Sequence, residues 1–209
     1  FSVVTYTGTG ANATVGHGLG VAPAFYVVKS RSYASGNWVS WHTSIGQPNI
    51  LWLNTTNGNV NYPTAFNSTN PTSSVISLGT AAETNGSGFT FVAYCWTPIA
   101  GFSAFGSYTG NASTDGPFVY TGFRPKFVMV KNTGLVSDWA TFDSARDTYN
   151  TTQYALRPNT SGAETSGSSL QLLSNGFKWT DAGTTVNQSG ATLIYMAFAE
   201  SPFRNSLAR

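Results

Sequence analysis

The alternation of apolar and polar positions predicts β-strands along almost the whole chain. Residues 24–29 and 126–131 are short, nearly continuous apolar runs, which are typical of central strands buried on both faces. Clusters of Gly, Asn, Ser and Thr interrupt the pattern at the spacing of roughly 8–12 residues that sandwiches and barrels show. No segment has a convincing helical period. We therefore expect an all-β protein built from antiparallel β-sandwiches of the jelly-roll or concanavalin-like type.

An internal repeat organises this pattern. Short strings return about 102 positions further along the chain, as YTG does at residues 6–8 and 108–110. The period is long for a solenoid repeat and suits a small β-domain. We therefore expect two homologous sandwich domains, residues 1–100 and 101–209, packed together. The other matching segments are 20–25 with 122–127, 37–42 with 138–143, 51–54 (loosely) with 154–157, and 73–78 with 168–173.

Alternation within the matched segments 37–42 and 138–143 assigns side chains to faces of the sheet. Trp41 and Phe142 fall on the apolar side of their strands, and we expect both in the core. Trp38 and Trp139 fall on the opposite side among polar neighbours. We expect these two tryptophans to be partly exposed.

The composition limits the kinds of partner. Only 9% of the residues are charged while 14% are aromatic, so the surface is polar but nearly uncharged rather than disordered. Affinity of such a surface is little affected by salt, which suits an extracellular or virion setting. The net charge of +2 comes without Lys and Arg clusters, which argues against nucleic acid. No apolar run of transmembrane length is present, and we expect no membrane insertion.

The single cysteine, Cys95, precludes a disulfide within the chain. It lies in the apolar string FTFVAYCW, which predicts a buried and inert thiol. The chain begins within what reads as a strand, which suggests a fragment or mature product of a longer protein.

Several of the repeated strings resemble a known kind of domain. GSYTGN at 106–111, DGPFVYTGFRPKFVMVK at 115–131, GHGLGVAP at 16–23 and YMAFAESPF at 195–203 are similar to a repeated domain of tail-fibre or virion structural proteins from marine and other bacteriophages. The resemblance covers essentially the whole chain. It implies a fibre or adhesin module in the virion, and it carries over no catalytic motif. By analogy with fibres, it also implies a homo-oligomer, with a trimer as the expected state.

Catalytic and metal chemistry have little support in the sequence. With two histidines and one cysteine, no ligand pair has the spacing of a zinc site, and a Gly-x-Ser-x-Gly elbow is absent. We expect no cofactor and no enzyme activity. Calcium remains open, because Asp143 and Asp147 offer carboxylates, although a solvated turn with Asp147 pairing to Arg146 or capping is the simpler interpretation. A glycosidase needs a pair of carboxylates that flank the scissile bond. The candidates in this chain are Glu83, Asp143, Asp147, Glu164 and Glu200.

Binding is the better-supported chemistry. Sugar sites combine an aromatic platform with hydrogen-bonding side chains, and alternation places Trp52 on the same face as Asn54. Each aromatic residue has the alternative interpretation of a core or subunit-interface residue. The candidate surface for a glycan or a protein partner comprises Trp38, His42, Trp52, Asn54, Trp139, Asp143, Arg146 and Arg157.

Three functions remain in view. The first is a non-enzymatic virion or tail-fibre module that attaches to host-surface polysaccharide or to another virion protein. The second is a purely structural capsid or tail decoration protein. The third is a glycan depolymerase, for which Asp143 and Glu200 would be the first residues to test.

Overall fold

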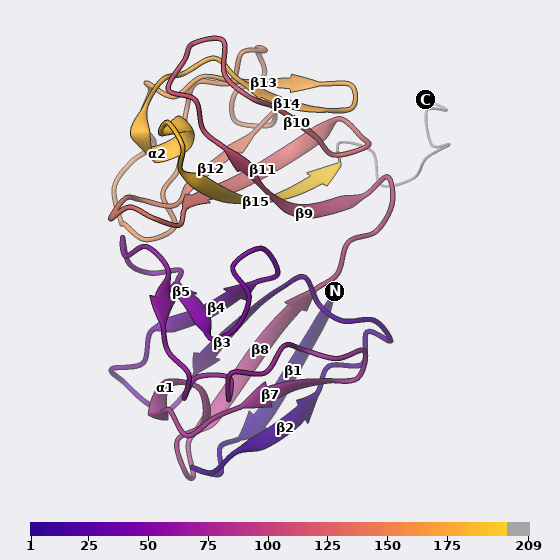
Figure 1. Ribbon diagram of the computed structural model, residues 1–209, viewed down its shortest axis with the longest axis vertical. Helices are drawn as coiled ribbons and strands as arrows, with labels where there is room; N and C mark the ends of the chain where they lie inside the picture. The colour runs from indigo at the N-terminus through magenta and orange to yellow at the C-terminus, as the bar shows by residue number, and fades with distance from the viewer. Residues whose placement is uncertain (200–209) are drawn as a thin grey trace. The chain divides into compact units, whose positions relative to one another are not determined.

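The computed structural model describes residues 1–199, which form two compact units (Figure 1). Unit 1 spans Phe1–Thr97, and unit 2 begins at Pro98, close to the boundary that the sequence places at residue 100. Both units consist of antiparallel strands, and the two α-helices of the described chain have four residues each. The all-β class is confirmed. No helix within residues 1–199 has the length and apolar character needed to cross a bilayer.

Unit 1 is a sandwich of a large and a small antiparallel sheet. The core lies between them: Tyr26 and Trp41 come from the large sheet, and Ile76 and Leu78 from the small one. The large sheet has the order β1 (Ser2–Thr7), β8 (Thr90–Trp96), β3 (Phe25–Ser30), β4 (Trp38–His42), β5 (Asn49–Trp52), β6 (Val60–Asn61). The small sheet pairs β2 (Ala13–Gly16) with β7 (Val75–Leu78), and α1 (Ala82–Asn85) follows β7.

Unit 2 has the same two-layer plan. Its first sheet has the order β12 (Ala140–Asp143), β11 (Pro125–Asn132), β15 (Thr192–Ala199), β9 (Ser103–Thr109). Its second sheet has the order β10 (Phe118–Tyr120), β14 (Gly176–Trp179), β13 (Leu170–Leu173), and α2 (Thr184–Asn187) follows β14.

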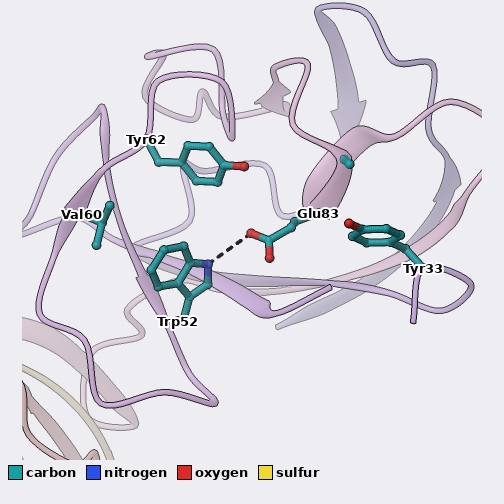
Figure 2. Close-up of a pocket in the computed structure, with 6 residues that line it drawn as sticks. Tyr33, Trp52, Val60, Tyr62 and Glu83 are labelled. Carbon is teal, nitrogen blue, oxygen red and sulfur yellow. Dashed lines mark hydrogen bonds between the residues drawn. The ribbon is translucent and has the colours of Figure 1, made fainter. Parts of the chain in front are cut away.

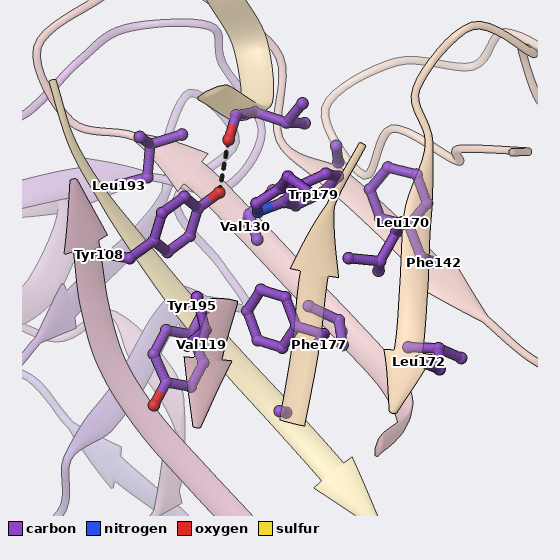
Figure 3. Close-up of a cluster of buried hydrophobic side chains, with 14 of the residues drawn as sticks. Tyr108, Val119, Val130, Phe142, Leu170, Leu172, Phe177, Trp179, Leu193 and Tyr195 are labelled. Atoms are coloured by element: carbon purple, nitrogen blue, oxygen red, sulfur yellow. Dashed lines mark hydrogen bonds between the residues drawn. The ribbon is translucent and has the colours of Figure 1, made fainter. Parts of the chain in front are cut away.

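Aromatic rings fill the core of unit 2 (Figure 3). Trp179 meets Phe142 edge-on with ring centroids 5.3 Å apart, and Phe177 meets Tyr195 in the same way at 5.5 Å. Edge-to-face contacts of this kind add about 0.5–1.5 kcal/mol each beyond the burial of apolar area. Because these residues come from both sheets, the rings join the two layers.

The central strands lie where the apolar runs predict them. β3 is flanked by β8 and β4, and β11 by β15 and β12. Five of the six residues of β3 are buried, which explains why its sequence is nearly continuous in apolar residues.

Strand order corresponds between the two units. β1-β8-β3-β4 in unit 1 has the counterpart β9-β15-β11-β12 in unit 2, and the pair β2–β7 has the counterpart β10–β14. This pairing corrects one part of the sequence alignment: the counterpart of β7 is β14, whose Gly176 follows Val75 by 101 positions, and not residues 168–173. The apolar run at 168–173 misleads because β13 is a further strand beside β14. Homology of the two halves stays a prediction that this correspondence supports.

A buried asparagine holds the same loop in each unit. In unit 1 the Asn85 amide donates to the carbonyl oxygens of Ala11 and Gly79 at 2.7 Å each, and its Oδ1 accepts from the Thr9 amide at 2.9 Å. Asn85 is fully buried. Its side chain therefore satisfies backbone groups that have no ladder partner.

Asn187 makes the matching contacts in unit 2. Its amide donates to the carbonyl oxygens of Ser113 and Asp181, and its Oδ1 accepts from the Asn111 amide at 2.8 Å. Each of these partners lies 102 positions beyond its counterpart in unit 1. We call this set of hydrogen bonds from a buried asparagine to three backbone groups the asparagine clamp. The repeated strings therefore preserve the clamp as well as the strand pattern.

The repeated glycine beside this clamp has a steric cause. A Cβ at Gly8 would lie 2.2 Å from the carbonyl oxygen of Gly86, and a Cβ at Gly110 would lie 2.2 Å from that of Gln188. Neither position leaves space for a side chain. This accounts for the glycine of the YTG string in both halves.

The core residues expected from alternation are mostly in place. Trp41 and Phe142 are buried, as predicted. Trp139 is 1% exposed, so the prediction of a partly exposed side chain is wrong for it, whereas Trp38 is 36% exposed. Alternation assigns a residue to a face of its sheet but does not reveal whether that face is covered.

Cys95 is buried, and burial raises the pKa of its thiol to about 12, which agrees with an inert cysteine.

Candidate functional site

Unit 1 contains a cavity of about 440 Å³ with aromatic walls (Figure 2). Its size lies within the range of about 300–1,000 Å³ that small-molecule sites occupy. The walls combine three aromatic side chains with one carboxylate. The cavity is lined by Tyr33, Trp52, Val60, Tyr62, Ala82 and Glu83.

Strand pairing positions one wall of the cavity. Trp52 is the last residue of β5 and lies opposite Val39 of β4. On the other edge, β5 pairs with the short β6, which carries Val60. Tyr62 follows β6, and its backbone amide donates to the carbonyl oxygen of Pro48 at 3.0 Å. The ring centroids of Trp52 and Tyr62 are 6.4 Å apart, so the two rings form a tilted pair.

A loop and a helix supply the opposite wall. Tyr33 lies in the loop after β3, where its backbone amide donates to Ser30 Oγ at 2.9 Å. Glu83 lies in the first turn of α1. Figure 2 shows Glu83 between the Trp52 indole and Tyr33, with the Tyr62 hydroxyl directed into the same space.

Three hydrogen bonds fix the Glu83 carboxylate. Oε1 accepts from the backbone amide and the side-chain amide of Asn37, at 3.2 and 2.7 Å. Oε2 accepts from Trp52 Nε1 at 3.3 Å. The same contacts hold the Trp52 indole in place at the cavity wall, so the acid both faces the cavity and orients its aromatic platform.

Two asparagines extend this network behind the cavity. Asn54 donates from Nδ2 to Asn37 Oδ1 at 2.9 Å, and Asn54 Oδ1 accepts from the Trp38 amide at 2.9 Å. Glu83 also affects its neighbour Tyr62 across the cavity. Burial and, after it, the negative charge of Glu83 raise the pKa of the Tyr62 hydroxyl, so this group stays a neutral hydrogen-bond donor.

The predicted binding residues of the first half fall in different places. Trp52 lines the cavity, and Asn54 supports it through Asn37. Trp38 is partly exposed and packs on Tyr94, with ring centroids 6.3 Å apart, instead of lining the cavity. His42 is 1% exposed, and its Nδ1 accepts from the Ser44 amide at 3.1 Å, so the expectation of a surface ligand contact is wrong for His42.

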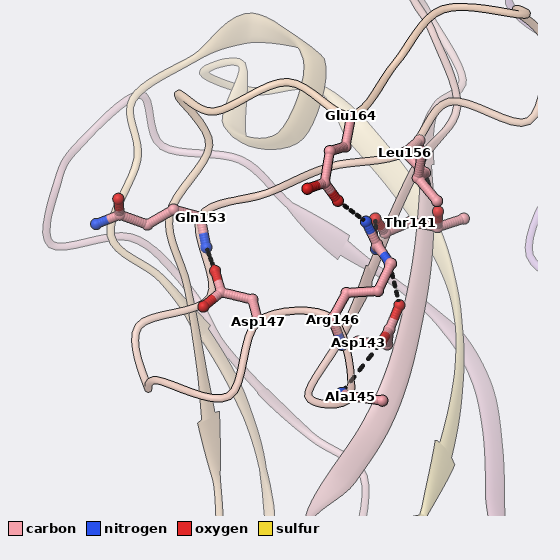
Figure 4. A network of polar contacts seen from close by, with 8 residues as sticks. All are labelled: Thr141, Asp143, Ala145, Arg146, Asp147, Gln153, Leu156 and Glu164. Atoms are coloured by element: carbon pink, nitrogen blue, oxygen red, sulfur yellow. Dashed lines mark hydrogen bonds and ion pairs between the residues drawn. The ribbon is translucent and has the colours of Figure 1, made fainter.

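In the second half, Asp143 and Arg146 form a polar network with Glu164 (Figure 4). Arg146 Nε lies 2.5 Å from Asp143 Oδ2, and Nη1 lies 3.0 Å from Glu164 Oε2. Burial acts to raise the pKa of Asp143, but the hydrogen bonds and charge of Arg146 lower it overall. Arg146 pairs with Asp143 and Glu164 and not with Asp147, so that predicted pairing is wrong, and Asp147 accepts from the Gln153 backbone amide at 2.6 Å within the same loop.

The other two candidates of the second half are structural. Arg157 Nε pairs with Asp138 Oδ2 at 3.0 Å. Trp139 is buried, so it does not belong to the surface that the sequence proposes.

The described chain gives no support to a metal centre. Residues 1–199 contain no cluster of three His, Cys, Asp or Glu side chains suited to holding a metal. Asp143 and Asp147, the carboxylates considered for calcium, are engaged by Arg146 and by the Gln153 amide. Glu200 and the following residues 201–203 of the last repeated string lie outside the described residues.

Tyr33, Tyr62 and Glu83 are site residues that binding arguments from the sequence missed. They lie up to 50 positions apart, and only the folding of β5, β6 and α1 brings them together. One signal was available: Glu83 is the only acidic residue of the first hundred. Beside it, the first hundred residues hold only two other charged side chains, Lys29 and Arg31.

Comparison with known proteins gives a family and no function. No curated protein and no solved structure gives a significant match to the chain. The family model described as a domain of unknown function, DUF7483, matches residues 1–202, which is nearly the whole chain. The chain therefore belongs to the DUF7483 family.

Proposed function

We propose that this chain is a non-enzymatic attachment module whose unit 1 cavity binds carbohydrate on a cell surface. The observation that carries the proposal is the Trp52–Glu83 pair at an aromatic cavity of about 440 Å³. Apolar faces of sugar rings stack on indole and phenol rings, and the hydroxyl rims need nearby hydrogen-bonding groups. Trp52 and Tyr62 provide the rings, while Glu83 and the tyrosine hydroxyls provide the polar contacts.

The setting that we propose is a bacteriophage tail fibre or another virion structure. It is supported by the resemblance of the repeated strings to phage virion domains. The nearly uncharged exterior also supports it, because adhesion would then change little with ionic strength. Host polysaccharide is the corresponding partner.

A screen of bacterial surface polysaccharides, followed by calorimetry, tests the proposed function. Trp52→Ala and Tyr62→Ala should each weaken binding of the best polysaccharide about tenfold, the equivalent of about 1.4 kcal/mol. The matched control is Tyr149→Ala in unit 2, an 83% exposed ring that lies outside the cavity, and it should bind like the wild type. Equal affinity for the wild type and both cavity variants would refute the site.

A further inference from the structure

We infer that the unit 1 cavity selects a sugar that carries a positively charged amine over its neutral counterpart. The inference rests on the proposed function and names the ligand class for the same site.

The carboxylate of Glu83 has an unused acceptor position. An ionised carboxylate offers about four lone-pair sites, two on each oxygen. Asn37 occupies both sites of Oε1, and Trp52 Nε1 occupies one site of Oε2. Among the residues that the structure describes, no further donor reaches Glu83. One site on Oε2 is therefore open to a donor from a ligand.

Within residues 1–199, no ion pair joins Glu83 to either cation of unit 1, Lys29 or Arg31, and the Lys29 ammonium donates to the carbonyl oxygen of Gly36 instead. Ion pairs of the described chain join Arg146, Arg157 and Lys178 to acids of unit 2, and none involves Glu83. Glu83 is the only acid of residues 1–97. Its three donors are neutral amide and indole N–H groups, which orient the carboxylate without cancelling its charge.

The cavity walls favour the same sign of ligand. The faces of Trp52, Tyr62 and Tyr33 are negative, because the aromatic quadrupole places electron density above and below each ring. A cation near such faces gains about 0.5–2 kcal/mol. A carboxylate with an open lone pair, set among three aromatic rings, is complementary to an ammonium group. A neutral N-acetyl group lacks that charge, and an acidic sugar would be repelled.

Calorimetry with two matched ligands tests this inference. A β-1,4-linked glucosamine oligomer and its fully N-acetylated counterpart are titrated into the whole chain at mildly acidic pH. Under these conditions the amine of the glucosamine unit is protonated. The glucosamine oligomer should bind about tenfold or more tightly, in line with a hydrogen bond to a charged group. The preference should shrink as salt is added.

The variant Glu83→Gln keeps the side-chain size and removes the charge. It should lower the affinity for the glucosamine oligomer about tenfold and leave the affinity for the N-acetylated oligomer nearly unchanged. Glu164→Gln, the same change in the Arg146 network of unit 2, is the control and should retain the preference. Thermal melting of each variant confirms that the fold is intact.

The outcomes separate the inference from the proposed function. Equal binding of the two oligomers, or no binding of the glucosamine oligomer, overturns the inference. A preference that survives Glu83→Gln overturns it too. The proposed function is judged independently by the polysaccharide screen and by Trp52→Ala, which should weaken any sugar bound in this cavity, charged or neutral.

Discussion

Corresponding positions in the two units make the same backbone contact but carry different chemistry. Asn54 Oδ1 accepts from the Trp38 amide at 2.9 Å, and Asn159 Oδ1 accepts from the Trp139 amide at the same distance. Asn54 and Asn159 also donate to corresponding residues, Asn37 and Asp138. In each unit, the segment that carries this asparagine is therefore held in the same way, to the start of β4 in unit 1 and to the residue before β12 in unit 2.

Two residues before this asparagine the units diverge. Unit 1 has Trp52, which donates to Glu83 at the aromatic cavity. Unit 2 has Arg157 there, which pairs directly with Asp138. In unit 1 the charged group stays open to a ligand, whereas in unit 2 the charges neutralise each other. The backbone contacts are common to both units, whereas the side chains differ, and for this reason our proposal places ligand binding in unit 1.

Removing the buried asparagine should have the largest effect on either unit. Asn85→Ala and Asn187→Ala each remove three hydrogen bonds from a buried side chain to backbone groups, at about 0.5–1.5 kcal/mol for each bond. We expect each variant to lower the free energy of unfolding of its unit by about 2–4 kcal/mol. Urea denaturation followed by tryptophan fluorescence measures the change, with the exposed Asn57→Ala as control. A much smaller loss in one unit would break the correspondence between the two clamps.

Lys131 should give unit 2 a pH-dependent stability. Burial lowers the pKa of its ammonium from 10.5 to about 8, although Nζ donates to the carbonyl oxygen of Ser137 at 2.6 Å. Between about pH 8 and 10.5 the unfolded chain binds more protons at this site than the folded chain, so stability should rise with pH.

The free energy of unfolding should rise by about 2 kcal/mol over this range. A pKa shift contributes about 1.4 kcal/mol for each unit, and the expected rise is smaller than the full shift would give because solvent screens part of the charge. Denaturation of the wild type and of Lys131→Met across this range isolates the contribution, since tyrosines titrate in both proteins. A constant difference between the two proteins would contradict the assignment.

Breaking the ion pair of unit 2 should have the smallest effect. Arg157 and Asp138 are 37% and 28% exposed, and such pairs contribute less than about 1 kcal/mol. Arg157→Ala should therefore change the unfolding free energy slightly and leave carbohydrate affinity unaltered. A loss of sugar binding in this variant would show that unit 2 also takes part in recognition, so that the two units would not differ in function.

The strands were predictable because their signal is local. The apolar runs at 24–29 and 126–131 needed only their own composition to indicate central strands. The alternation around Trp41 likewise identified a core residue. Burial of Trp139 was not predictable, since it depends on what covers the outer face of the sheet.

Alignment of the halves failed where loops change length. Leu51 lies opposite Ser40, and Leu156 lies opposite Thr141; both hydroxyls donate to the carbonyl oxygen of the leucine. These leucines are 105 positions apart, whereas the alignment of the two halves by sequence pairs residue 51 with residue 154. Residues 51–54 (Leu-Trp-Leu-Asn) and 156–159 (Leu-Arg-Pro-Asn) share two residues of four. That similarity is too small to locate the insertion between them in the sequence. For this reason Arg157 was not recognised as the counterpart of Trp52.

The pairing of first and last strands in each unit bears on how such a chain could grow. Ser2 lies opposite Cys95 in unit 1, and Ser103 lies opposite Phe198 in unit 2. Within residues 1–199, the first and last strands of each unit thus lie side by side. A gene segment that encodes one unit can therefore be duplicated in tandem without any change of strand order. After such a duplication, selection for ligand binding can act on one copy while the sequence of the other changes.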